Sequence, residues 1–146
     1  VVISRHLWYR LYIDNERMNN MTSQISKLGN HRNGKRIWIE GTRLIDSGFT
    51  RGTLYSAFYG TRFADPVVAD DTPKVLVLTS SARLMDHGKN SAIIQDSPRK
   101  VSGKGNHPII DISGKKLGEY FSGCESVQVI YNNCLITIVG IPTPAN

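Results

Sequence analysis

The chain has few of the residues on which several protein classes depend. Its 146 residues include only two cysteines, Cys124 and Cys134, too few for a disulfide framework and without the histidines of a structural zinc site. We expect both thiols to be reduced and half-buried. No apolar run approaches the roughly 20 residues that span a membrane, and no signal peptide is evident. We therefore expect no membrane association and a cytoplasmic setting.

Signatures of catalysis are equally scarce. The four histidines, at 6, 31, 87 and 107, are scattered without metal-ligand spacing, and none has an evident catalytic partner. The glycine-containing segment at 100–105 (KVSGKG) lacks the spacing of a phosphate-binding loop and resembles a flexible basic loop. The sequence therefore predicts no enzyme activity, no metal and no cofactor.

Positive charge is what the chain has in excess. The formal net charge is +6 and the pI is about 9.5. The basic residues fall in two blocks: residues 26–51 hold six against two acids, and residues 99–116 hold five against one. An excess of this kind favours an anionic partner, most often nucleic acid.

The first basic block leads into a segment with a clear strand pattern. Ile37 and Ile39 alternate with Trp38 and Glu40, so the two isoleucines point to one face of a strand. Trp38 on the other face could stack on a nucleic-acid base. We favour the simpler interpretation, an outward-facing tryptophan that covers the surface of the fold.

A corner and a short helix follow this strand. Gly41 suits a corner with a positive φ angle, and Thr42 could cap the helix through its side-chain oxygen. Gly48 could end the helix as a left-handed residue, with Phe49 folding back as an apolar anchor.

The same order of elements recurs 73 residues later. With this offset, residues 27–44 and 100–117 share six identities in 18 positions, including the pair Gly41 and Gly114. The similarity continues into a hairpin in each copy, and the first copy has 13 extra residues in that connection. The sequence therefore predicts an internal repeat.

The predicted organisation has five parts. Apolar and β-branched runs predict strands at 53–59, 74–79, 127–131 and 135–139, with a brief strand near 91–94. Residues 21–36 are predicted to be a flexible basic loop with a turn at Asn33-Gly34. The parts are an N-terminal arm (1–20), a first repeat (21–80), a connecting segment (81–98), a second repeat (99–140) and a tail (141–146).

These patterns resemble a known family of small DNA-binding proteins. The residues that carry the resemblance are 37–49, then Arg51-Gly52 and the strand at 53–59. They are similar to the AbrB/SpoVT swapped-hairpin superfamily, in particular its SymE-like branch; the second copy, 110–121, is a looser match. Similar modules precede some phage-type cytosine-5 methyltransferase domains, whose catalytic signatures are not in this sequence. The resemblance implies a mainly β fold with short helices, an AbrB-like β-barrel in which two repeats interlace their hairpins.

The resemblance also implies a function, duplex DNA binding through the two basic loops. The candidate DNA contacts are Lys27, His31, Arg32, Lys35, Arg36, Arg43, Lys100, Lys104, His107, Lys115 and Lys116. A solvated charged surface is the plainer alternative. Two other functions stay open. One is a protein-interaction module such as an antitoxin or inhibitor, which would bind its partner through the N-terminal arm and the acidic loop after the strand at 53–59 (Asp65, Asp70 and Asp71). The other is a SymE-like toxin that acts on nucleic acid. The chain could be a monomer, as an intrachain pseudo-dimer, or a homodimer.

Overall fold

Two antiparallel sheets and two short helices make up the described part of the chain. A computed structural model describes residues 23–32, 34–61, 74–81, 92–95 and 98–143. The strands are β1 (Ser23–Lys27), β2 (Gly29–His31), β3 (Gly34–Glu40), β4 (Leu54–Thr61), β5 (Val75–Thr79), β6 (Ala92–Gln95), β7 (Arg99–Lys100), β8 (Ser102–Lys104), β9 (His107–Gly114), β10 (Cys124–Asn132) and β11 (Leu135–Pro142), and the helices are α2 (Thr42–Asp46) and α4 (Lys115–Tyr120). The predicted mainly β class with short helices is confirmed.

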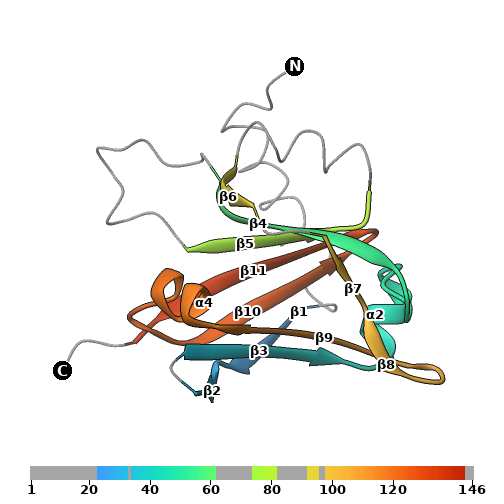
Figure 1. Ribbon diagram of the computed structural model, residues 1–146, viewed down its shortest axis with the longest axis horizontal. Helices are drawn as coiled ribbons and strands as arrows, with labels where there is room; N and C mark the ends of the chain where they lie inside the picture. The colour runs from blue at the N-terminus through green and yellow to red at the C-terminus, as the bar shows by residue number, and fades with distance from the viewer. Residues whose placement is uncertain (1–22, 33, 62–73, 82–91, 96–97, 144–146) are drawn as a thin grey trace.

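The two sheets lie one above the other (Figure 1). The larger has the order β1-β10-β11-β5-β4-β6, with β7 also paired to β4, and the smaller has the order β2-β3-β9-β8. Leu28 joins β1 to β2, and Val101 joins β7 to β8, so the chain passes from one sheet to the other at both of these buried residues. Neither sheet of the described residues closes into the barrel that the sequence resemblance implied.

One hydrophobic core is shared by the two sheets. Ile37 and Ile39 on β3 are buried, whereas Trp38 between them is 42% exposed, which confirms the predicted alternation. Leu76 and Leu78 on β5 belong to the same core cluster. The predicted strand at 74–79 is confirmed as β5, which begins at Val75. All five residues of β5 are buried.

Strand registers in the smaller sheet follow the sequence offset of 73. In the β3–β9 pair, Trp38 lies opposite Asp111, the residue 73 positions later. The β2–β3 hairpin pairs Gly29 with Arg36, and the β8–β9 hairpin pairs Ser102 with Ile109, again 73 positions on. The two halves are therefore related by an approximate two-fold axis that passes between Trp38 and Asp111.

The larger sheet obeys the same symmetry. Where β5 and β11 pair, Val77 lies opposite Thr137, an offset of 60. This is the offset of 73 reduced by the 13 residues that are extra in the first copy. The approximate axis therefore passes through the middle of both sheets.

Each half covers the hairpin of the other. The backbone carbonyl of Ser47, just after α2, accepts a hydrogen bond from the amide of Cys134, in the β10–β11 turn, at 2.8 Å. In the other half, the Tyr120 hydroxyl of α4 accepts from the Val75 amide at 3.0 Å and donates to the Val75 carbonyl at 2.9 Å. The halves thus share one interlaced structure rather than packing as separate units.

The main error of the sequence prediction concerns the basic loops. Residues 23–31 form strands β1 and β2, and residues 99–104 form β7 and β8, where flexible loops were predicted. Their side chains lack an apolar pattern because these strands lie at sheet edges, where backbone pairing to β10, β3, β4 and β9 holds them. The predicted tail is also wrong at its start, since β11 continues to Pro142.

The predicted corner and helix end are mostly confirmed. Gly41 has φ of 98°, and Gly48 has φ of 86°, with the buried Phe49 donating its amide to the Leu44 carbonyl at 2.8 Å. The predicted Thr42 cap is wrong, because Gly41 is the N-cap residue and no side chain caps the helix. The predicted arm (1–20) lies outside the described residues, as do most of the acidic loop after β4 and most of the connecting segment.

Candidate nucleic-acid interface

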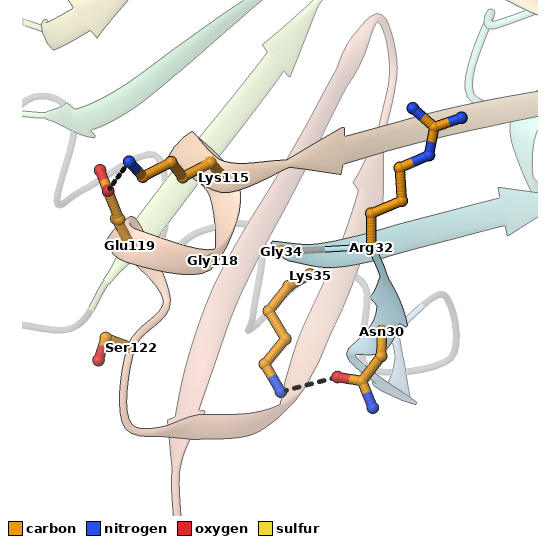
Figure 2. A pocket seen from close by; sticks show the side chains of 8 residues that line it. All are labelled: Asn30, Arg32, Gly34, Lys35, Lys115, Gly118, Glu119 and Ser122. Atoms are coloured by element: carbon orange, nitrogen blue, oxygen red, sulfur yellow. Dashed lines mark hydrogen bonds and ion pairs between the residues drawn. The ribbon is translucent and has the colours of Figure 1, made fainter.

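Three of the predicted DNA contacts meet at one open pocket. A hollow of about 550 Å³ lies between the β2–β3 turn and α4. Its basic lining residues are Arg32 and Lys35 from the first half and Lys115 from the second; Glu119 is its single acid. Asn30, Gly34, Gly118 and Ser122 complete the lining (Figure 2). Residues 80 positions apart in sequence are thus brought to one site.

Two of these cations have only weak local partners. Lys35 donates to the Asn30 side-chain oxygen at 3.2 Å, and Lys115 lies 3.9 Å from a Glu119 carboxylate oxygen (Figure 2). Both side chains of the Lys115–Glu119 pair are strongly exposed, at 81% and 69%, so solvent screens their attraction. Such groups can exchange their present contacts for a phosphate at little cost.

Arg32 occupies an unusual backbone position at the rim of this pocket. It lies in the β2–β3 turn with φ of 52°, a left-handed conformation that L-residues other than Asn and Asp seldom adopt. Its counterpart in the second half is Gly105, with φ of 55°. Among the described residues, the Arg32 guanidinium has no hydrogen-bond or ion-pair partner. A strained residue that presents a free cation is a candidate for function.

Two glycines set the close approach between α4 and β3. A Cβ atom on Gly34 would lie 2.1 Å from the Gly114 carbonyl oxygen, and one on Gly118 would lie 3.3 Å from the Gly34 Cα. Their counterparts in the other half are His107 and Ile45, both with side chains. The helix of the second half is therefore held tightly against β3, which keeps Lys115 beside Lys35.

Two further lysines flank the other side of α4. Lys116 lies over the Tyr59 ring at 5.0 Å, and Lys74 lies over the Tyr120 ring at 5.6 Å. The two tyrosine rings contact each other edge to face, with their centroids 5.3 Å apart. Lys74 was not among the DNA contacts predicted from the sequence, because it follows an acidic loop and belongs to neither basic block. Only the fold places it beside α4.

The Arg36 side chain already has partners within the protein, so it is less free to contact DNA than the sequence suggested. Its guanidinium forms a two-pronged ion pair with Asp111, at 2.8 Å and 2.9 Å, and stacks over Trp38 at 4.5 Å. The hydrogen bond with Asp111 is the main cause that raises the pKa of Arg36 above its usual value. Trp38 is thus covered on one ring face, which supports a packing role over a base-stacking one.

His107 is also paired with an acid. Its Nε2 lies 3.1 Å from the Glu40 carboxylate, on the outer surface of the smaller sheet. Hydrogen bonds from His107 and then Trp38 lower the pKa of Glu40. On this surface each basic side chain is paired with an acidic one, Arg36 with Asp111 and His107 with Glu40, so it does not form a patch of unpaired cations.

Arg43 lies at the opposite end of the molecule from α4. Its guanidinium donates to the Gln24 side-chain oxygen at 2.7 Å and lies over the Tyr131 ring at 5.9 Å. Gln24 in turn donates to the Tyr131 hydroxyl at 2.8 Å. Burial raises the pKa of Tyr131 to about 12. Arg43 is thus held in a structural contact.

The other predicted contacts are dispersed along sheet edges. Lys27 ends β1, Lys100 ends β7 and Lys104 ends β8, and all three side chains are exposed. His31 ends β2, next to the turn that holds Arg32. The three lysines are not among the residues that line the pocket.

A second hollow occupies the symmetry-related position and has a different chemistry. It measures about 430 Å³ and is lined by Ile45, Thr50, Arg51, Gly105, Asn106 and Pro108. Gly105 is the counterpart of Arg32, Pro108 of Lys35 and Ile45 of Gly118 by the offset of 73. One half therefore has a basic pocket and the other a mostly uncharged one.

In the described part of the chain there is no metal cluster, no disulfide and no membrane-spanning helix. Within those ranges, no group of three or more histidine, cysteine, aspartate or glutamate residues could hold a metal ion. Both cysteines are free, Cys124 buried and Cys134 partly exposed, and burial raises the pKa of Cys124. Of the helices in the described segments, none combines the length and apolar character of a membrane span.

The fold and the site together define a basic, mainly β protein with two interlaced halves and one cationic pocket. Comparisons with protein-family models, with curated proteins and with solved structures gave no match in any of the three.

Proposed function

We propose that this chain is a DNA-binding module, a single-chain relative of the AbrB-like swapped-hairpin proteins that acts in the cytoplasm as a monomer. Two features support the fold assignment: the strand registers that follow one offset, and the hydrogen bonds through which each half covers the hairpin of the other. In this proposal the two sheets correspond to the two sides of the family's small barrel, joined at Leu28 and Val101.

The observation that carries the function is the pocket beside α4. Arg32, Lys35 and Lys115 line this pocket from both halves, with Glu119 as its single acid, and their charged ends extend in different directions around it (Figure 2). Three cations of this kind can contact adjacent phosphates of a duplex backbone, giving affinity with little sequence choice. The set of DNA contacts expected from the two basic loops is therefore smaller than the sequence suggests, because Arg36 and His107 are already paired with acids.

Fluorescence anisotropy with a labelled duplex over a salt series tests the proposal. Three to five phosphate contacts predict that log K falls against log salt with a slope of roughly −2.5 to −4.5. Substitution of Arg32 should weaken binding more than substitution of Arg36, because the Arg36 charge is already neutralised by Asp111. Absence of binding at low salt would contradict DNA binding altogether.

Two alternatives are distinguished in the same experiments. Incubation with RNA and gel analysis of the products would reveal the SymE-like toxin. A protein-interaction module would depend on the N-terminal arm, so deletion of residues 1–20 would abolish partner binding and leave DNA affinity unchanged. No observation on the described residues favours either over DNA binding.

A further inference from the structure

The two ends of the smaller sheet differ in charge although the backbone is nearly two-fold symmetric. The α4 end comprises the side chains on α4, those lining its pocket, and Lys74 on Tyr120. It has five cations and one acid: Arg32, Lys35, Lys74, Lys115, Lys116 and Glu119. The α2 end comprises the side chains on α2, those lining the second hollow, and Glu40 at the end of β3. It has two cations and two acids: Arg43, Arg51, Glu40 and Asp46.

The difference arises from substitutions between counterpart positions. Arg32, Lys35 and Lys115 correspond to Gly105, Pro108 and Thr42 by the offset of 73. Glu40, which borders α2, corresponds to Ser113, so the α2 end also gains an acid that the α4 end lacks. Two pairs match in charge, Arg43 with Lys116 and Asp46 with Glu119, and both of these cations are held over a tyrosine ring.

The close contact between Gly34 and Gly118 is a further difference between the α4 end and the α2 end. Gly34 and Gly118 let α4 approach the backbone of β3, and this places Lys115 at the pocket of Lys35. At the α2 end the position of Gly118 is taken by Ile45, which is 37% exposed and lines the second hollow. The two ends are therefore built for different surfaces.

We infer that the protein grips duplex DNA at one end only, through the α4 end, and so contacts one phosphate cluster rather than two clusters related by the two-fold axis. This inference rests on the proposed DNA binding and specifies its geometry. The two hollows lie at opposite ends of the β3–β9 pair, about 20 Å apart at ~3.3 Å per residue over some six residues. A two-sided grip would contact two separate phosphate clusters over that distance, whereas a one-sided grip contacts one.

Two double variants that each remove two positive charges provide the test. Arg32→Gly with Lys115→Thr places at the α4 end the residues that the α2 end already has. Arg43→Gln with Arg51→Gln is the matched control at the α2 end. The α4-end variant should bind duplex DNA at least tenfold more weakly, with a salt slope reduced by about 2, and the α2-end variant should change affinity less than twofold.

A second test uses a transplant variant, in which the α4-end cations are added at the α2 end, so the expected result is a gain of DNA contact rather than a loss. Thr42→Lys with Gly105→Arg installs the α4-end cations at the α2 end, and Gly105 already has the left-handed φ that Arg32 adopts. Hydroxyl-radical footprinting should show one protected cluster for the native protein and a second cluster, about 20 Å away, for the transplant. Circular dichroism and thermal melts check that each variant is folded.

The outcomes separate the inference from the proposed function. Equal weakening by the two double variants, or two protected clusters with the native protein, would overturn one-sided binding and leave DNA binding intact. A native protein that does not bind duplex at low salt would overturn both. One protected cluster, lost only in the α4-end variant, supports both.

Discussion

The close contact between Gly34 and Gly114 leaves no room for a side chain at position 34. A Cβ atom at position 34 would lie 2.1 Å from the Gly114 carbonyl oxygen, 2.3 Å from its carbonyl carbon and 2.8 Å from the Lys115 amide nitrogen. All three are backbone atoms, so no side chain can rotate away to make room. Ordinary contact begins at 3.4 Å, so in Gly34→Ala the two backbones must separate by about 1.3 Å, the difference between these distances.

This separation opens the end of the β3–β9 ladder, where Lys35 pairs with Gly114. Overpacking typically costs about 1–3 kcal/mol, and loss of a ladder hydrogen bond adds about 1 kcal/mol. We therefore expect Gly34→Ala to lower the free energy of unfolding by roughly 2–4 kcal/mol. For a chain of this size, that lowers Tm by roughly 5–15 °C.

Gly29→Ala on the neighbouring strand is the matched control. Its added Cβ would meet Arg36 atoms only at 3.6 Å and 3.7 Å, which is ordinary contact. The alanine also restricts the unfolded chain, which stabilises by about 0.4–1 kcal/mol. Differential scanning calorimetry should show a Tm equal to or slightly above that of the native protein. Two variants that melt within 2 °C of each other would refute the close approach at Gly34.

Three further predictions concern single side chains. Arg32→Gly should raise Tm by up to roughly 4 °C in a thermal melt, because glycine relieves the left-handed strain at φ of 52° while its own chain entropy offsets part of the gain; a lower Tm would show that the arginine makes a stabilising contact. Asp111→Asn should lower the free energy of unfolding measured in urea, and lower it more at low salt than at high salt, because the ion pair with Arg36 is about one-third exposed and is screened by salt; an effect that does not change with salt would argue against an ionic contribution. The pKa of Tyr131 is raised to about 12 from 10.0, so its contribution to stability is complete below pH 10 and lost as pH rises towards 12; Tyr131→Phe should therefore lose less stability than the native protein between pH 9 and pH 11 in urea titrations, and equal losses would contradict this.

Residues with an apolar pattern were the ones that the sequence located well. Ile37, Ile39 and the apolar residues of β5 (75–79) have side chains that belong in a core, so their alternation or their apolar character predicts their burial. Edge strand β1 has one large apolar residue, Ile25, and it is 72% exposed. Nothing in its side chains predicts a strand, because the pairing with β10 comes from the backbone.

The site was predicted in part for a similar reason. The basic blocks in the sequence identified Arg32, Lys35 and Lys115 as candidate DNA contacts. They could not show that these residues share one pocket, because the pocket forms only where α4 of one half packs on β3 of the other. The basic blocks also could not separate these residues from Arg36, whose partner Asp111 lies 75 positions away. The repeat predicted two basic loops, and only the counterpart positions in space show which cations of each loop line a pocket.

The place of Trp38 opposite Asp111 has a consequence for the joining of the two halves in one chain. A residue on a two-fold axis faces its own counterpart, so a symmetric pair of first halves would set Trp38 against Trp38. A symmetric pair of second halves would set Asp111 against Asp111, and like charges directly opposite each other destabilise a sheet. A single chain escapes this constraint, because its axial position can hold two different residues. Here one of them pairs with Arg36 and the other packs beneath it.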